Sequence, residues 1–97
     1  MARILAAIVT TSGAGIRAWH PFGMLDGAQW LGLGANELLI HASDICAGLE
    51  LPFRPAASTS DAVLSDVLAL HNRARDTSLP TDPFAALLQL SGRAAPV

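Results

Sequence analysis

A long helix between residues 26 and 49 is the feature that most constrains how this chain can fold. Asp26 stands three residues before Gln29, the spacing of a capping box at a helix N-terminus. Pro52 and Pro55 follow the segment, and proline cannot continue a helix because it lacks a backbone N–H and its ring clashes with the preceding turn. The sequence therefore predicts the longest helix of the chain here.

The N-terminal turns of this helix have the lowest helix propensity. Gly32 and Gly34 each cost about 1 kcal/mol relative to alanine inside a helix. The first two turns are therefore expected to bend, or the helix begins only at Ala35.

Three further segments have helical patterns. Residues 2–12 are rich in Ala, Ile and Leu and end at a glycine-containing turn. A third helix is predicted to begin at an N-cap, either Ser58 with Asp61 or Ser60 alone. Residues 82–92 carry an N-cap aspartate, a first-turn proline and a terminating glycine, which together predict a short final helix.

The fold class that follows is all-α. The stretch GIRAWHPFGML, residues 15–25, is predicted to be a connection, because a residue before proline, here His20, is biased away from the helical region. No strand of any length is predicted, and no domain boundary or internal repeat is evident. With 97 residues the chain is expected to form one domain over residues 1–97, a helical bundle with a small core.

The composition predicts that some apolar surface needs a partner. Hydrophobic residues make up 52% of the chain and charged residues only 14%, against a usual charged share of about 25%. Apolar surface of this kind marks protein interaction sites. One hypothesis is therefore a non-catalytic helical module that dimerises or docks on a partner chain.

Charge and cysteine content exclude several classes of function. The net charge is −2 and the six basic residues are scattered, so neither nucleic-acid binding nor binding to an anionic membrane is expected. A single cysteine, Cys46, excludes an internal disulfide and suits a reducing cytoplasm, which is the predicted location. No stretch reaches the roughly 20 apolar residues of a membrane span.

Three polar residues line up on the long helix. At about 100° per residue, His41 lies about 40° to one side of Glu37 and Asp44 about 20° to the other. Trp30 shares this side, as a core residue or as the wall of a pocket, and Cys46 lies about 180° away, in the predicted core. Because apolar residues flank the stripe, we expect it to face a partner helix. The solvent-facing arc is then expected around Gly32, Asn36, Ser43 and Ala47.

A divalent metal ion would explain this stripe. A buried carboxylate needs a charged partner, and residues four apart on a helix are close enough to share one ion. Glu37 and His41 are therefore candidate metal ligands, and Asp44 could bind the ion or hold the other imidazole nitrogen. The simpler alternative is a hydrogen-bonded Glu–His pair without metal. Two ligands are also too few, because zinc usually takes at least three from the protein.

Two stretches resemble a known family in the order of their motifs. Residues 19–54 combine WHPFG, ELLIHASDICAGL and a proline-containing exit, and residues 82–93 read DPFAALLQLSGR. They resemble the later part of DinB-like proteins related to mycothiol-dependent maleylpyruvate isomerase. The resemblance implies a four-helix bundle that binds a metal, typically zinc, through a Glu and a His of the ELLxH helix and a His of an earlier helix.

The resemblance carries Glu37 and His41 over as metal ligands and gives Asp44 the acidic position of HxxD, where we expect it to support the imidazole. It also implies binding of a small thiol, such as mycothiol, as its thiolate, followed by transfer or isomerisation. A coordinated cation deprotonates a thiol near neutral pH. Which residues would carry out catalysis is not assigned by the pattern.

The resemblance covers only part of the family's bundle. Its first two helices, one of which supplies the third ligand, have no counterpart before residues 2–12, so a partial bundle is expected. His20 is expected to be a turn residue and His71 a helix-end residue, and neither replaces the ligand. The prediction is a metal-binding fragment that is catalytically incomplete alone, completed by an N-terminal half or by a second copy.

Overall fold

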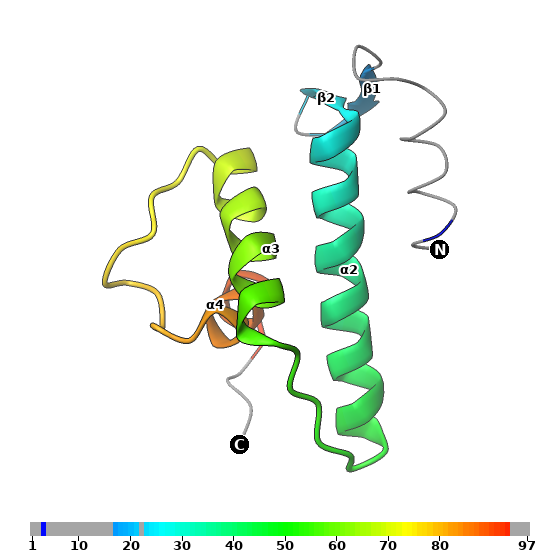
Figure 1. Ribbon diagram of the computed structural model, residues 1–97, viewed down its shortest axis with the longest axis vertical. Coiled ribbons are helices and arrows are strands. Elements are labelled where there is room, and N and C mark those ends of the chain that lie inside the picture. The colour runs from blue at the N-terminus through cyan, green and yellow to red at the C-terminus, as the bar shows by residue number, and fades with distance from the viewer. Residues whose placement is uncertain (1–2, 4–16, 22, 94–97) are drawn as a thin grey trace.

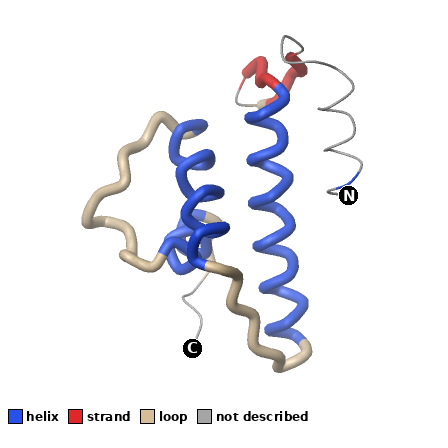
Figure 2. Tube along the Cα trace, in the orientation of Figure 1, coloured by secondary structure: helices blue, strands red, loops and turns tan. Residues whose placement is uncertain are grey.

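The structure is a computed structural model that describes residue 3, residues 17–21 and residues 23–93 (Figure 1). The elements in order are β1 (Arg17–His20), β2 (Gly23–Asp26), α2 (Gly27–Gly48), α3 (Ala57–Leu70) and α4 (Pro83–Leu90). The helix predicted over residues 2–12 lies, apart from Arg3, outside the described residues. Figure 2 shows the long α2 with α3 and α4 on one side of it and the two strands at its N-terminal end.

The prediction of an all-α bundle is wrong. The described part of the chain combines three helices with a two-stranded antiparallel sheet, so it is a small mixed α/β domain. The strands pair from Arg17 opposite Asp26 to His20 opposite Gly23. Two local preferences favour this hairpin: the residue before Pro21 is extended, and Gly23 adopts a φ of 115° that other residues avoid.

The hairpin is held against the first turns of α2 by Trp30. The indole Nε1 donates a hydrogen bond of 3.3 Å to the carbonyl oxygen of Ala18 in β1. The imidazole of His20 meets the indole edge to face, with ring centroids 5.1 Å apart. Trp30 is half-buried and therefore serves as the anchor of the hairpin, a role that the sequence did not suggest.

The capping-box prediction for α2 is confirmed. The Asp26 carboxylate accepts a hydrogen bond of 2.8 Å from the Gln29 backbone N–H, and the Gln29 side chain accepts one of 2.8 Å from the Asp26 backbone N–H. The alternative start at Ala35 is wrong, because this reciprocal cap satisfies N–H groups that the helix leaves unpaired. At the other end Glu50 has a φ of 58°, and the Leu51 N–H bonds back to the Cys46 carbonyl at 2.8 Å.

The other two helices begin differently. The prediction for α4 is confirmed: the Asp82 carboxylate accepts a hydrogen bond of 2.8 Å from the Ala85 N–H, and Gly92 ends the helix with a φ of 82°. The predicted side-chain cap of α3 is wrong, because the helix begins at Ala57 without one. Ser60 lies one turn inside α3, where it is fully buried.

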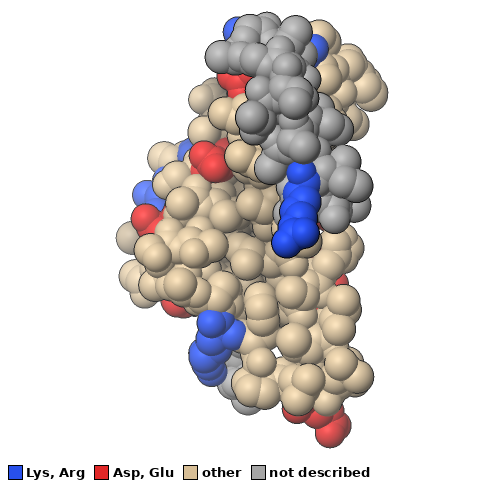
Figure 3. Space-filling view, turned by 45° about the vertical axis from the view of Figure 1, so that its right-hand side comes forward, with Lys and Arg blue, Asp and Glu red and all other residues tan. Residues whose placement is uncertain are grey.

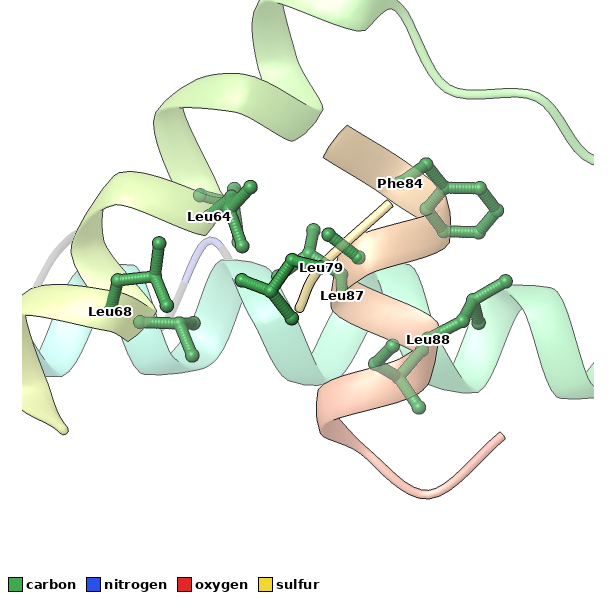
Figure 4. Close-up of a cluster of buried hydrophobic side chains, with 10 residues drawn as sticks. Leu64, Leu68, Leu79, Phe84, Leu87 and Leu88 are labelled. Carbon is green, nitrogen blue, oxygen red and sulfur yellow. The ribbon is translucent and has the colours of Figure 1, made fainter. Parts of the chain in front are cut away.

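The core lies between the three helices, as the close-up in Figure 4 shows. Helix α3 contributes one apolar face and α4 packs across it, while α2 adds few buried side chains. The T-shaped contact between Phe53 and Phe84, with centroids 5.7 Å apart, closes the core on the side of the 49–56 link. The buried members of the cluster are Ile40, Val63, Leu64, Val67, Leu68, Leu79, Phe84, Ala86, Leu87 and Leu88.

Helix α2 approaches α3 closely at Gly32. A Cβ added at Gly32 would lie only 2.9 Å from the Cβ of Asp66 on α3, so the glycine permits this close approach. Gly32 and Ile40 are the buried residues of α2 among those described. The face that we predicted to meet solvent, around Gly32 and Asn36, is therefore turned toward α3. None of the described helices or strands packs along the opposite face of α2, which carries Glu37 and His41.

Candidate functional site

The structure brings the two predicted metal ligands together on the open face of α2. The Nε2 atom of His41 lies 3.0 Å from the Oε2 atom of Glu37. Both side chains are exposed, 65% for His41 and 60% for Glu37. The predicted proximity of the Glu37 and His41 side chains is confirmed. The predicted packing of this stripe against another helix is wrong, because both side chains are exposed and no helix within residues 17–21 and 23–93 covers them.

The separation of these two atoms suits both interpretations that the sequence left open. It is an ordinary length for a hydrogen bond between an imidazole and a carboxylate. Two donors at zinc–ligand distances near 2.0 Å in tetrahedral geometry lie about 3.3 Å apart, so a small shift would place one ion between them. The 3.0 Å separation is therefore that of a hydrogen-bonded pair, and it is also close to the separation of two atoms that bind the same zinc ion.

Asp44 is held by the other end of the described chain. Arg93 donates from Nε to Oδ1 at 2.7 Å and from Nη2 to Oδ2 at 2.6 Å, a two-pronged ion pair that joins α2 to the residues after α4. This hydrogen bonding lowers the pKa of the Asp44 carboxyl below its ordinary value, and partial desolvation opposes the shift. The predicted contact between Asp44 and the imidazole of His41 stays a prediction.

Sequence reasoning did not assign a role to Arg93. It is the closing residue of the DPFAALLQLSGR motif, and Gly92 turns the chain so that Arg93 follows α4 directly. The pKa of Arg93 is raised above its ordinary value, chiefly by the hydrogen bonds to Asp44 and to a smaller extent by the charges of Asp44 and Glu37. The pairing of Asp44 with Arg93 spans 49 residues, so no local pattern in the sequence could identify it.

The pKa of Asp44 provides a test of this ion pair. A carboxyl whose pKa is lower in the folded state stabilises the fold above its unfolded pKa, near 3.8, and loses that contribution as the pH falls through the folded value. We expect Arg93→Ala to return the Asp44 pKa toward its ordinary value, measured by carboxyl ¹³C NMR. Arg75→Ala, which removes a guanidinium paired with Asp61, is the control and should leave the Asp44 pKa unchanged.

An equal shift in both variants, or none in Arg93→Ala, would contradict the assignment. The titration reports on the carboxyl itself, so it is independent of any change in global stability.

A complete metal site is not found within the described part of the chain. No group of three or more His, Cys, Asp or Glu side chains is placed to hold one ion there. His20 lies in the hairpin against Trp30, and His71 is the C-cap of α3. Cys46 is half-buried on another side of α2. The assignment of Glu37 and His41 as metal ligands therefore stays a prediction.

The remaining surface offers no stronger site among the described residues. A shallow hollow between the start of α2 and the end of α3 is lined by Asp26 and Asp66 and contains neither candidate ligand. Figure 3 shows charged side chains as separate patches on a largely uncharged face. Within residues 17–21 and 23–93, no helix combines the length and hydropathy that a membrane span requires.

Comparison of the chain with family models, with curated proteins and with solved structures gives no match. The resemblance to DinB-like proteins therefore stays a prediction based on the order of the motifs.

Proposed function

We propose that the open face of α2 is a half-site for a divalent cation, with Glu37 Oε2 and His41 Nε2 as two of its ligands. Zinc is the first candidate, because it accepts both a carboxylate oxygen and an imidazole nitrogen. The observation that carries the proposal is the convergence of these two atoms at 3.0 Å on an accessible helix face.

The charges around the pair support this assignment. Arg93 neutralises Asp44 through two hydrogen bonds, so the charge of Asp44 is already balanced. The hydrogen bond of Glu37 is to His41, which is a metal ligand in its neutral form. A cation bound between them would balance the Glu37 carboxylate and would use the imidazole nitrogen that now faces it.

The chemistry of such a centre would follow from the ligand that occupies its open position. A zinc-bound thiol is held as the thiolate, and the resemblance to mycothiol-dependent enzymes suggests a small thiol in that position. With two ligands from this chain, the centre needs further donors before it could support transfer or isomerisation. We therefore propose metal binding as the function of this chain. Catalysis would require further metal ligands from outside the Glu37–His41 pair.

A second candidate function is a non-catalytic interaction module. It is favoured by large apolar side chains that are exposed on α2 beside the polar pair: Leu31, Leu38 and Ile45. Exposed apolar patches of this kind mark interaction surfaces. On this alternative, Glu37 and His41 would form only a surface hydrogen bond.

Titration calorimetry with zinc separates the two candidates. We expect the unmodified protein to bind zinc with submicromolar affinity, and Glu37→Ala and His41→Ala each to weaken binding by at least about 100-fold, because each removes one direct ligand. His71→Ala and Glu50→Gly are matched controls, since each removes the same kind of group from another exposed position. Absence of zinc binding, or equal zinc affinity in all variants, would contradict a metal site at Glu37 and His41. The interaction module would then be the remaining candidate function.

A further inference from the structure

The exposed apolar side chains of α2 follow a regular spacing. Leu31, Leu38 and Ile45 are seven residues apart and are 40%, 43% and 63% exposed. Ala42 and Leu49 lie four residues after Leu38 and Ile45, which gives the alternating three- and four-residue spacing of a helix–helix seam from Leu38 onward, while Ala35, four residues after Leu31, packs against the core at the edge of this face. The open face of α2 thus has the pattern of a surface that packs against another helix.

We propose that a second copy of this chain packs antiparallel on this face, and that the two Glu37–His41 pairs together bind one zinc ion. The inference rests on the proposed function, because it names the source of the missing ligands. Two glutamates and two histidines would supply the four donors that a closed tetrahedral zinc site requires. A symmetric dimer uses the same patch on both copies, as this arrangement does.

The charges of α2 favour the antiparallel orientation. Glu37 and Asp44 are its acidic residues, and it contains no lysine or arginine. Parallel pairing in register would place each carboxylate beside the same carboxylate of the other copy, which is destabilising. Antiparallel pairing about residue 39 places Glu37 beside the partner's His41, so that a carboxylate faces an imidazole on both sides.

The polar pair and the apolar seam share nearly the same centre. Residue 39 is the midpoint of Glu37 and His41, and residue 40 is the midpoint of the seam from Leu31 to Leu49. The two centres differ by one residue, about 1.5 Å along the helix. A twofold axis that passes between the two antiparallel helices at this level, perpendicular to both, therefore serves both sets of residues. On one side of the helix pair it places the two Glu37–His41 pairs together, and on the other side it places the two apolar seams together.

The arrangement of the described elements leaves room for this partner. Helices α3 and α4 lie on the other side of α2, where Gly32 and Ile40 are buried (Figure 1). Antiparallel pairing also brings the hairpin of one copy to the C-terminal end of α2 of the other. Exposed apolar residues occur at both ends, with Met24 57% exposed in β2 and Leu49 64% exposed after α2.

Sedimentation equilibrium combined with metal analysis tests the dimer. We expect a dimer that holds one zinc per two chains, and we expect Ile45→Glu to be a folded monomer that has lost submicromolar zinc binding. Ile45 is exposed, so this substitution should leave the helical circular dichroism unchanged. Ser65→Glu adds the same charge to an exposed position of α3 and should preserve the dimer and its zinc.

The outcomes separate this inference from the proposed function. A monomer that binds one zinc per chain through Glu37 and His41 overturns the dimer and keeps the metal function. A dimer that binds no zinc overturns both the shared site and the metal function. A monomer that binds no zinc also overturns both the shared site and the metal function. The apolar seam would then have to bind a different protein.

Distances between spin labels test the orientation. Ala47 is exposed and does not belong to the seam, so a nitroxide on Ala47→Cys, in a Cys46→Ala background, should not disturb the contact. Pairing about residue 39 separates the two labelled positions by about 24 Å along the helix axis, whereas parallel pairing in register separates them by about 0 Å along it. A short distance between the labels would overturn the antiparallel arrangement.

Discussion

Leu64→Ala is expected to lower the free energy of unfolding by about 3 to 4 kcal/mol, the largest single effect predicted for this chain. Leu64 is 0% exposed and lies on the face of α3 that meets both other helices of the core. Truncation removes apolar contacts and leaves a cavity that the surrounding helices fill only in part. Urea denaturation followed by circular dichroism measures the change.

Leu51→Ala is the matched control for this substitution. The same atoms are removed from a side chain that is 56% exposed, so a change within about 0.5 kcal/mol is expected. Equal losses in the two variants would mean that Leu64 does not occupy the core as described.

Gly32→Val is expected to cost about 3 kcal/mol, because it overfills the contact between α2 and α3. The first atom added at Gly32 already falls 2.9 Å from the Cβ of Asp66, and valine adds two methyl groups beyond it. Valine is a slightly better helix former than glycine, so local propensity predicts the opposite sign. Denaturation of the variant measures which effect wins.

Two further variants identify the cause. A Cβ at Gly48 meets nothing within 4 Å, so Gly48→Val should be neutral or mildly stabilising. Asp66→Gly removes the atoms that the new side chain meets, so Gly32→Val should cost less in that background than alone. Equal costs in both backgrounds would contradict the close approach of α2 to α3.

The helix boundaries were the part of the fold that local sequence could predict. Asp26 bonds to Gln29, and Asp82 accepts from the Ala85 backbone N–H, both within the first turn of a helix, so no distant contact is needed to place these helix starts. The start of α3 could not be predicted in this way. Ser60 has the side chain of an N-cap, but it is buried by packing against the core.

The hairpin was missed because its strands are too short to show alternation. RAWH and GMLD have four residues each and contain no β-branched residue. The hairpin depends instead on Pro21, on the positive φ of Gly23 and on the contact of Trp30 with β1. Only the first two are local features of the sequence.

The orientation of α2 could not be predicted from side-chain polarity. Its apolar residues surround Glu37 and His41, which suggested that this side is buried. The packed side was instead selected by the small residue Gly32, which allows α3 to approach, and by Ile40. Spacing placed Glu37 and His41 together correctly, whereas the pairing of Asp44 with Arg93 spans 49 residues and has no local signal.

Long-range ¹H–¹⁵N NMR of the imidazole groups tests the central claim most directly. The chain contains three histidines, so each ring can be followed separately while zinc is added. We expect zinc to shift the Nε2 resonance of His41 by direct coordination and to leave the resonances of His20 and His71 in place. Glu37→Ala should remove the shift. An unchanged His41 resonance at saturating zinc, or a shift at His20 or His71 instead, would contradict this claim.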